Sequence, residues 1–487
     1  MSLLEALGRV LLGLAAAYGV GAAVSRAFTR GLTAGEKAGW SLATGLLVQT
    51  GCLLLLLAAG IGPRALPLLL AEAVVAGGAL LWTRGSKTEV SSPLPGEAPR
   101  DRALVAAFLG VAFCAWATFL VGALADPMWS TDFLAFWGYK GKVVFLTSEI
   151  PRRLFEDPAL YFAHKEYPLL VPLSLTALAG FVGEWNDQAL ALLFPACEAV
   201  TLFAIFGFLS RRVSAVSGAA AAALASLCFF LYRPANAGTA EVPFALGLVL
   251  LVAAALDFLA RDAASSAWRL AVAALFCASL KQEGTLFATL VAITLVLRLR
   301  ASEPRAGRRA AAALVLPPAA HWVALYLLRG NQTRRDFDFT LFTPSRWGEL
   351  PSIFVSVAGR MIGTEGRNVL PAILAILVFF IVTRRGAGDP LVGVFAIQMF
   401  FYAVAFTVSS FDPMYAIDGA FRRITMSLFP AFTIVMGARL GALVEGYGGS
   451  SRRTHQSSAP DRTPVEGESI SLPSRTAGEP QGGGITG

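Results

Sequence analysis

The apolar run ALVAAFLGVAFCAWATFLVGAL at residues 103–124 is followed by the polar and aromatic stretch DPMWSTDFLAFWGYKGKVVFLTSEIPRRLFEDPALYFAHKEYPLLVP at residues 126–172. The first segment is long enough to cross the roughly 30 Å of hydrocarbon in a bilayer as a helix. The second concentrates charges, aromatic rings and prolines where that helix would leave the membrane. Ionisable groups near hydrocarbon are costly and are retained mainly for function, so this junction predicts a membrane protein with its site in the second segment.

Composition extends the membrane prediction to the whole chain. Hydrophobic residues make up 56% of the 487 residues, charged residues only 15%, and the mean hydropathy is +0.63. Soluble domains carry roughly 25% charged residues. We therefore expect an all-α polytopic membrane protein with about thirteen transmembrane helices. The expected spans are 3–24, 39–60, 66–83, 103–124, 189–210, 213–232, 243–260, two from a hairpin within 268–299, 311–328, 369–383, 391–410 and 424–442.

The chain is expected to have three parts. Residues 1–102 supply N-terminal transmembrane helices and a cytoplasmic linker, residues 103–442 form the main membrane region, and residues 443–487 form a disordered cytoplasmic tail. The loops rich in Lys and Arg can all be cytoplasmic only if the apolar stretch 168–183 does not cross the membrane. We therefore expect that stretch to be a re-entrant or interfacial helix, within an outer loop at 125–187.

The basic charge is explained by membrane topology, and the cysteines are explained by helix packing. The net charge is +8, but the basic residues gather in the loops assigned to the cytoplasm, so the expected partner is membrane lipid and no nucleic acid. The five cysteines fall inside expected spans and form no CxxC pair, which favours packing residues over a metal cluster or a disulfide framework.

The first outer loop contains the strongest candidate for a general base. Asp132 follows a span and begins an aromatic segment, with Trp137 in it, that runs to Lys140 and suits a helix lying in the membrane interface. A carboxylate in that position can accept a proton from a substrate that arrives from water. Asp126 is nearer to the span and is expected mainly to end the helix, while Lys140 could also be an ordinary polar edge of a surface helix.

A divalent cation is left open. His164 and Glu166 have a spacing at which both side chains could ligate a metal, but two ligands are too few to specify a site. No other cofactor is expected.

Three charged residues in later outer loops are further candidates. Glu241 precedes an apolar run, so it either caps the helix that follows or contacts a substrate. Lys281 lies at the apex of a KQEG turn inside an apolar stretch and needs a polar cavity or an anionic partner, for which phosphate is suitable. Arg422 lies outside with its neighbour Arg423, against the positive-inside trend, which an anion or a pair with Asp412 or Asp418 would explain.

Taken in order, these segments resemble the GT-C glycosyltransferases, a superfamily that includes dolichyl-phosphate-mannose protein mannosyltransferases and bacterial aminoarabinose transferases. The resemblance lies in DFLAFWGYKGK after a span, HKEYPLLVPL before a short apolar helix, the carboxylate of Glu241, the KQEG hairpin and the late FRRITMSLFP. It covers roughly residues 103–442. The first loop departs from the family because it lacks an adjacent Asp-Glu or an Asp-x-Asp pair, so both Asp126 and Asp132 stay open as the base.

The resemblance implies a GT-C-like bundle in a bacterial plasma (inner) membrane, with interfacial helices in the first outer loop and the active site on the outer face. Such an enzyme moves a hexosyl or pentosyl group from a polyprenyl-phosphate-linked donor to an acceptor glycan, lipid or protein, with inversion. Asp132 would be the base. The expected substrate contacts are Asp126, Trp137, Lys140, Glu166, Glu241, Lys281 and Arg422.

The rival interpretation is a non-enzymatic transporter of a lipid-linked sugar or a polysaccharide. A transporter should carry polar residues along its spans, whereas here they concentrate at the outer ends of the spans. A catalytically inactive assembly subunit is a third interpretation.

Overall fold

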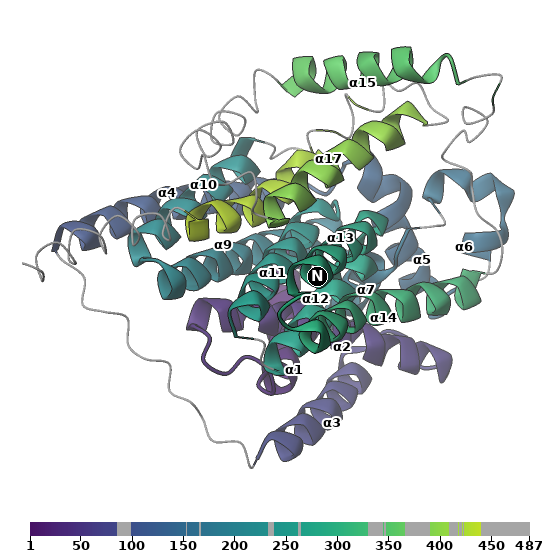
Figure 1. Ribbon diagram of the computed structural model, residues 1–487. Helices are drawn as coiled ribbons and strands as arrows, with labels where there is room; N and C mark the ends of the chain where they lie inside the picture. The colour runs from purple at the N-terminus through teal and green to yellow at the C-terminus, as the bar shows by residue number, and fades with distance from the viewer. Residues whose placement is uncertain are drawn as a thin grey trace, which may run out of the picture. The chain divides into compact units, whose positions relative to one another are not determined.

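In a computed structural model the described residues are 1–84, 99–151, 153–164, 167–231, 238–261, 264–329, 344, 347–365, 390–408, 417, 421 and 423–439. Every regular element in this part of the chain is helical, without a β-strand (Figure 1). Met1–Ala442 forms one compact unit. The expected tail at 443–487 lies outside the described residues.

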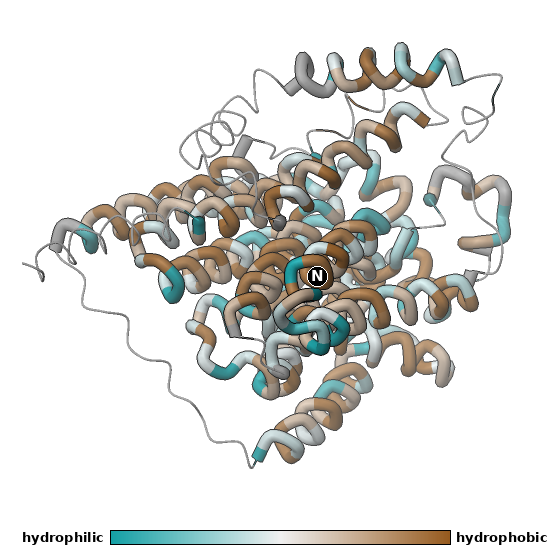
Figure 2. The backbone as a smooth tube through the Cα atoms, viewed as in Figure 1, coloured by the Kyte–Doolittle hydropathy of each residue, from teal (hydrophilic) through white to brown (hydrophobic). Residues whose placement is uncertain are grey.

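Within the described part of the chain, eight segments are long and apolar enough to cross a membrane, which makes the chain an integral membrane protein of the all-α polytopic class. Hydrophobic residues run along most of the helical turns (Figure 2). The eight segments comprise α1 (Leu3–Ser25), α2 (Ala34–Ala58), α3 (Ala65–Thr83), α4 (Pro99–Ala125), α8 (Asp187–Leu190) with α9 (Leu193–Arg212), α11 (Glu241–Arg261), α13 (Gln282–Leu299) and α14 (Pro304–Arg329).

Shorter apolar helices accompany these spans. They are α7 (Leu170–Val182), α10 (Ala215–Leu231), α12 (Ala264–Leu280), α15 (Leu350–Glu365) and α17 (Pro390–Thr407). A further helix occupies 423–439. The expected span at 369–383 lies outside the described residues, so the predicted number of thirteen stays a prediction.

The expected hairpin within 268–299 is confirmed. Helix α12 ends at Leu280 and α13 begins at Gln282, and Lys281 between them has an extended backbone (φ −148°, ψ 150°). A Cβ atom on Gly284 would lie 2.3 Å from the carbonyl oxygen of Cys277. Only glycine therefore allows the two helices to approach so closely below the turn.

Of the two alternatives expected for 168–183, a re-entrant or an interfacial helix, the packing of α7 contradicts the interfacial one, and the re-entrant one stays a prediction. Every residue of α7 is buried, and the helix packs against α1, α2 and α5 (Gly138–Thr147) inside the protein. The sequence LVPLSLTALAGFV is apolar on all faces, and a helix of this kind is stabilised by complete burial rather than by a position at the membrane surface.

Small residues allow the N-terminal helices to join the same unit. A Cβ atom on Gly21 would lie 1.8 Å from the carbonyl oxygen of Ser41, and one on Gly45 would lie 1.9 Å from that of Ala17. Helices α1 and α2 thus pack backbone to backbone, as membrane helices with small interface residues do. Since α2 also packs against α9, residues 1–84 are part of the main helical unit.

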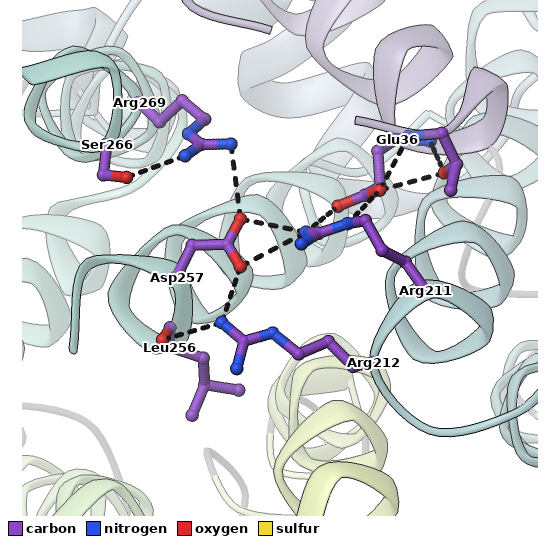
Figure 3. A network of polar contacts seen from close by, with 8 residues as sticks. Glu36, Arg211, Arg212, Leu256, Asp257, Ser266 and Arg269 are labelled. Carbon is purple, nitrogen blue, oxygen red and sulfur yellow. Dashed lines mark hydrogen bonds and ion pairs between the residues drawn. The ribbon is translucent and has the colours of Figure 1, made fainter. Parts of the chain in front are cut away.

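An ion network joins four helices at one end of α11 (Figure 3). Asp257 lies 2.9 Å from Arg211, 2.7 Å from Arg212 and 3.2 Å from Arg269. Arg211 also pairs with Glu36 at 2.6 Å, in the first turn of α2. The network therefore brings together the first turns of α2 and α12 and the last turns of α9 and α11.

We predict that Asp257→Asn lowers the free energy of unfolding by about 2–4 kcal/mol, because removing one partner of a buried ion pair leaves the other charges uncompensated. Arg212 and Arg269 would lose their carboxylate, and the Asp257 side chain is only 7% exposed. Thermal unfolding of the protein in lipid nanodiscs measures the effect. Glu5→Gln is the matched control, because the Glu5–Arg9 pair is about half exposed and such pairs contribute about 0–1 kcal/mol. Equal effects of the two substitutions would contradict a structural role for the network.

Candidate functional site

A second cluster of charges lies at the opposite end of α11. Glu241 is the first residue of this helix, and Asp257 follows sixteen residues later, which corresponds to about 24 Å along a helix axis. The intervening residues 242–255 are all buried. Helix α11 is therefore an apolar axis with one group of ion pairs at each end.

Lys281 connects two carboxylates in this cluster. Its Nζ atom lies 3.1 Å from Oε1 of Glu241 and 3.7 Å from Oε1 of Glu283. The side chains of Lys281 and Glu241 are only 9% and 4% exposed. Glu241 thus lies at the start of a helix, which was one of its two expected roles. It also neutralises the charge of Lys281 in the hairpin.

Asp132 forms the second ion pair of the cluster, with Arg423. The two groups come from distant parts of the chain, and both side chains are about one-fifth exposed. Asp132 directly precedes a π-helical turn, Phe133–Trp137, that leads into α5. Such turns are rare in proteins and frequently mark functional sites.

The two ion pairs act on each other. Glu241 and Lys281 both influence the titration of Asp132, and Arg423 influences that of Glu241. Burial raises the pKa of Asp132 above its ordinary value, although the nearby Arg423 acts in the opposite direction. Asp132 is therefore a better proton acceptor than an exposed aspartate, since a higher pKa means a more basic carboxylate.

Phe133 fixes the loop that carries Asp132. A Cβ atom on Gly138 would lie 2.5 Å from the Phe133 ring, and one on Gly238 would lie 2.7 Å from its Cβ atom. Gly238 has φ +87°, a conformation that favours glycine. The ring thus packs between two glycine backbones, and one of them lies three residues before Glu241. This packing fixes the position of Asp132 relative to Glu241.

The rings of Phe133, Phe136 and Trp137 are buried in the protein, so the predicted orientation of this segment, with its rings at headgroup level, is wrong. Trp137 is 1% exposed and stacks on Tyr167 with ring centroids 5.3 Å apart. Phe136 packs edge-on against both Tyr167 and His164. Mutual packing of the rings buries more apolar surface than a position among lipid headgroups would.

Lys140 has a structural contact that the sequence did not indicate. Its side chain is fully buried, and Nζ donates a hydrogen bond to the backbone carbonyl of His164 at 2.5 Å. His164 itself has a left-handed backbone (φ 43°). Lys140 therefore holds the turn that ends at His164, and the predicted contact with a donor phosphate would require this bond to break.

The remaining predicted residues are not brought into the cluster by the described structure. Asp126 is exposed just beyond the end of α4. Glu166 and Arg422 lie outside the described residues, so their predicted roles stay predictions. The described side chains include no group of three or more His, Cys, Asp or Glu residues that could hold a metal.

Sequence reasoning placed Arg422 and Arg423 outside together and then selected Arg422 as the ligand. Met426 is buried and lies four residues after one arginine and three after the other, so helical periodicity could not choose between them. Gln398 and Tyr402 were also missed, because a polar residue in an apolar run such as α17 gives no indication of what it faces. The one available signal was their separation by four residues, which places them on one face of a helix.

We predict that Lys281→Met destabilises the protein by about 3–5 kcal/mol, because it leaves two carboxylates without their cation. Adding Glu241→Gln should recover part of this loss, since it removes the more deeply buried of the two charges. Thermal unfolding in nanodiscs of the single and double variants measures both effects. A double variant no more stable than Lys281→Met would contradict the importance of the Lys281–Glu241 pair.

No protein-family model, no curated protein and no solved structure matches this chain. The resemblance to the GT-C glycosyltransferases therefore stays a prediction from the sequence.

Proposed function

We propose that this membrane protein is a glycosyltransferase that moves a sugar from a polyprenyl-phosphate-linked donor to an acceptor glycan, lipid or protein. The observation that supports the proposal is the meeting of Asp132, Glu241, Lys281 and Arg423 at one end of the buried helix α11. Clusters of perturbed titratable groups are typical of active sites. The proposed setting is the outer face of a bacterial plasma membrane, as the distribution of basic loops favours.

Lys281 and Arg423 are the proposed ligands of the donor phosphate. Both cations are paired with carboxylates in the protein without a ligand, so a phosphate must exchange with those partners. A phosphate that binds Arg423 competes with Asp132 for the guanidinium. Since that guanidinium lowers the pKa of Asp132, donor binding would make Asp132 more basic.

Asp132 is the proposed general base. It removes the proton from the acceptor hydroxyl as that oxygen attacks the anomeric carbon of the sugar. The bond between this carbon and the phosphate oxygen breaks, and the lipid phosphate leaves with the electron pair. Lys281 and Arg423 stabilise the leaving phosphate. Attack opposite to the leaving group inverts the configuration of the sugar.

A labelled polyprenyl-phosphate sugar distinguishes the enzyme from a transporter. In proteoliposomes an enzyme consumes the donor and releases polyprenyl phosphate, whereas a transporter moves the intact donor between leaflets. Intact donor that crosses the membrane without release of polyprenyl phosphate would contradict the proposal.

We predict that Asp132→Asn reduces turnover roughly 10²–10⁴-fold, the usual contribution of a positioned base. Donor binding should persist, because asparagine keeps the shape of the side chain and the cations remain. Release of polyprenyl phosphate and equilibrium binding of the donor measure the two properties separately. Asp126→Asn is the control, since Asp126 is exposed beyond α4 and should have a much smaller effect. If the ranking of the two variants were reversed, the role of base would move to Asp126.

The raised pKa of Asp132 predicts a pH dependence. Turnover should fall as the pH decreases through a value above the ordinary aspartate pKa of about 3.9, because the protonated carboxyl cannot accept a proton. Profiles of kcat and kcat/KM against pH measure this decrease. The pKa seen in kcat should be higher than that seen in kcat/KM if bound phosphate raises the pKa of Asp132 further. An acidic limb that persists in residual turnover by Asp132→Asn would assign it to another group.

A further inference from the structure

Three buried oxygen atoms on the helices α11, α13 and α17 have no hydrogen-bond partner among the described residues. They are Oε2 of Glu241, Oε2 of Glu283 and Oε1 of Gln398. Gln398 and Glu241 are only 1% and 3% exposed as whole residues. The three acceptors come from three different helices, α11, α13 and α17.

Tyr402 and Lys281 connect these acceptors into one group. Tyr402 lies one turn after Gln398 on α17, is hydrogen-bonded to it, and experiences the charges of both Glu283 and Glu241. Lys281 reaches the other oxygen atoms of the same two glutamates, at 3.1 Å and 3.7 Å. Glu241 and Glu283 thus flank the lysine proposed to hold the donor phosphate. Helix α17 packs against α13, with the rings of Phe395 and Phe287 5.3 Å apart, and Gln398 follows Phe395 by about one turn.

The chemistry of the group favours a ligand that donates hydrogen bonds. A buried acceptor without a donor is unfavourable by about 1–3 kcal/mol, so a ligand that supplies donors gains that free energy. Among the described residues, the cluster contains three carboxylates, of Asp132, Glu241 and Glu283, and the two cations Lys281 and Arg423. An ionised phosphate offers only further acceptors. Sugar hydroxyl groups offer donors.

We propose that Glu241, Glu283 and Gln398 bind the hydroxyl groups of the sugar on the donor, and that Gln398 and Glu283 determine which sugars are accepted. This inference rests on the proposed function. A site built to bind hydroxyl groups rejects an analogue that lacks them, because its buried acceptors are then left unpaired. Donors with the hydroxyl groups removed or acylated are therefore poor ligands.

Binding of short synthetic polyprenyl phosphates to the full-length protein in nanodiscs tests the inference. The probes are the bare polyprenyl phosphate and its mannosyl, glucosyl and arabinosyl derivatives, and the readout is the ratio of sugar-bearing to bare affinity. For the unaltered protein we expect at least one sugar to increase affinity about tenfold or more, as one or two hydrogen bonds to buried or charged acceptors would. Gln398→Met and Glu283→Gln should each remove most of that gain.

The matched control is Glu198→Gln. Glu198 is fully buried in α9 and both its carboxylate oxygens also have no partner among the described residues. This variant should keep the full affinity ratio. Thermal unfolding shows whether a variant has lost the affinity ratio because it is misfolded. If either Gln398→Met or Glu283→Gln is misfolded, the other variant decides the outcome.

Three results would overturn the inference. If no sugar adds affinity to the bare probe, the buried acceptors serve only water; if Gln398→Met and Glu283→Gln both keep the gain, other residues bind the sugar. If Glu198→Gln loses the gain equally, the effect is not local. In each case, binding of the bare probe and sugar transfer would leave the proposed function standing. Failure of every probe to bind, together with absence of transfer, would remove the proposed function as well.

Discussion

Helix α11 imposes the main physical constraint on this protein, because it is an apolar segment enclosed by other helices and can hold charge only at its two ends. Residues 242–255 are all buried, and an unpaired polar group among them would be unfavourable by several kcal/mol. Each end therefore gathers opposite charges from its neighbours. Asp257 pairs with arginines of neighbouring helices at one end, and Glu241 pairs with Lys281 at the other.

The two ends differ in whether both oxygen atoms of each carboxylate accept hydrogen bonds. We assign a structural role to the end where they do and a functional role to the other end. Both oxygen atoms of Asp257 accept hydrogen bonds from guanidinium groups, and so do both of Glu36 (Figure 3). At the other end, Glu241 and Glu283 each keep a buried oxygen without a partner. A carboxylate whose two oxygen atoms are both bonded needs no ligand, whereas each buried acceptor without a partner needs an explanation, and a bound ligand is one.

The first outer loop shows why an aromatic, charged segment next to a span need not lie on the membrane surface. Phe133 fills the space between two glycines, Trp137 stacks on Tyr167, and Lys140 bonds to a backbone carbonyl. These contacts turn the segment inward and place Asp132 at its inner start, facing Arg423. The segment is thus packed inside the protein and lines the candidate site.

The sequence by itself determined the helical membrane class, the hairpin that exposes Lys281 to the cluster, and the choice of Asp132 and Glu241, because long apolar runs and the rare charges between them follow from hydrophobic transfer alone. Only the tertiary structure decided which arginine pairs with Asp132, that α7 is enclosed by protein, and that Gln398 belongs to the cluster. These outcomes depend on which faces of distant helices meet. Local periodicity carries no information about such meetings, since in an apolar helix every face is equally suited to burial.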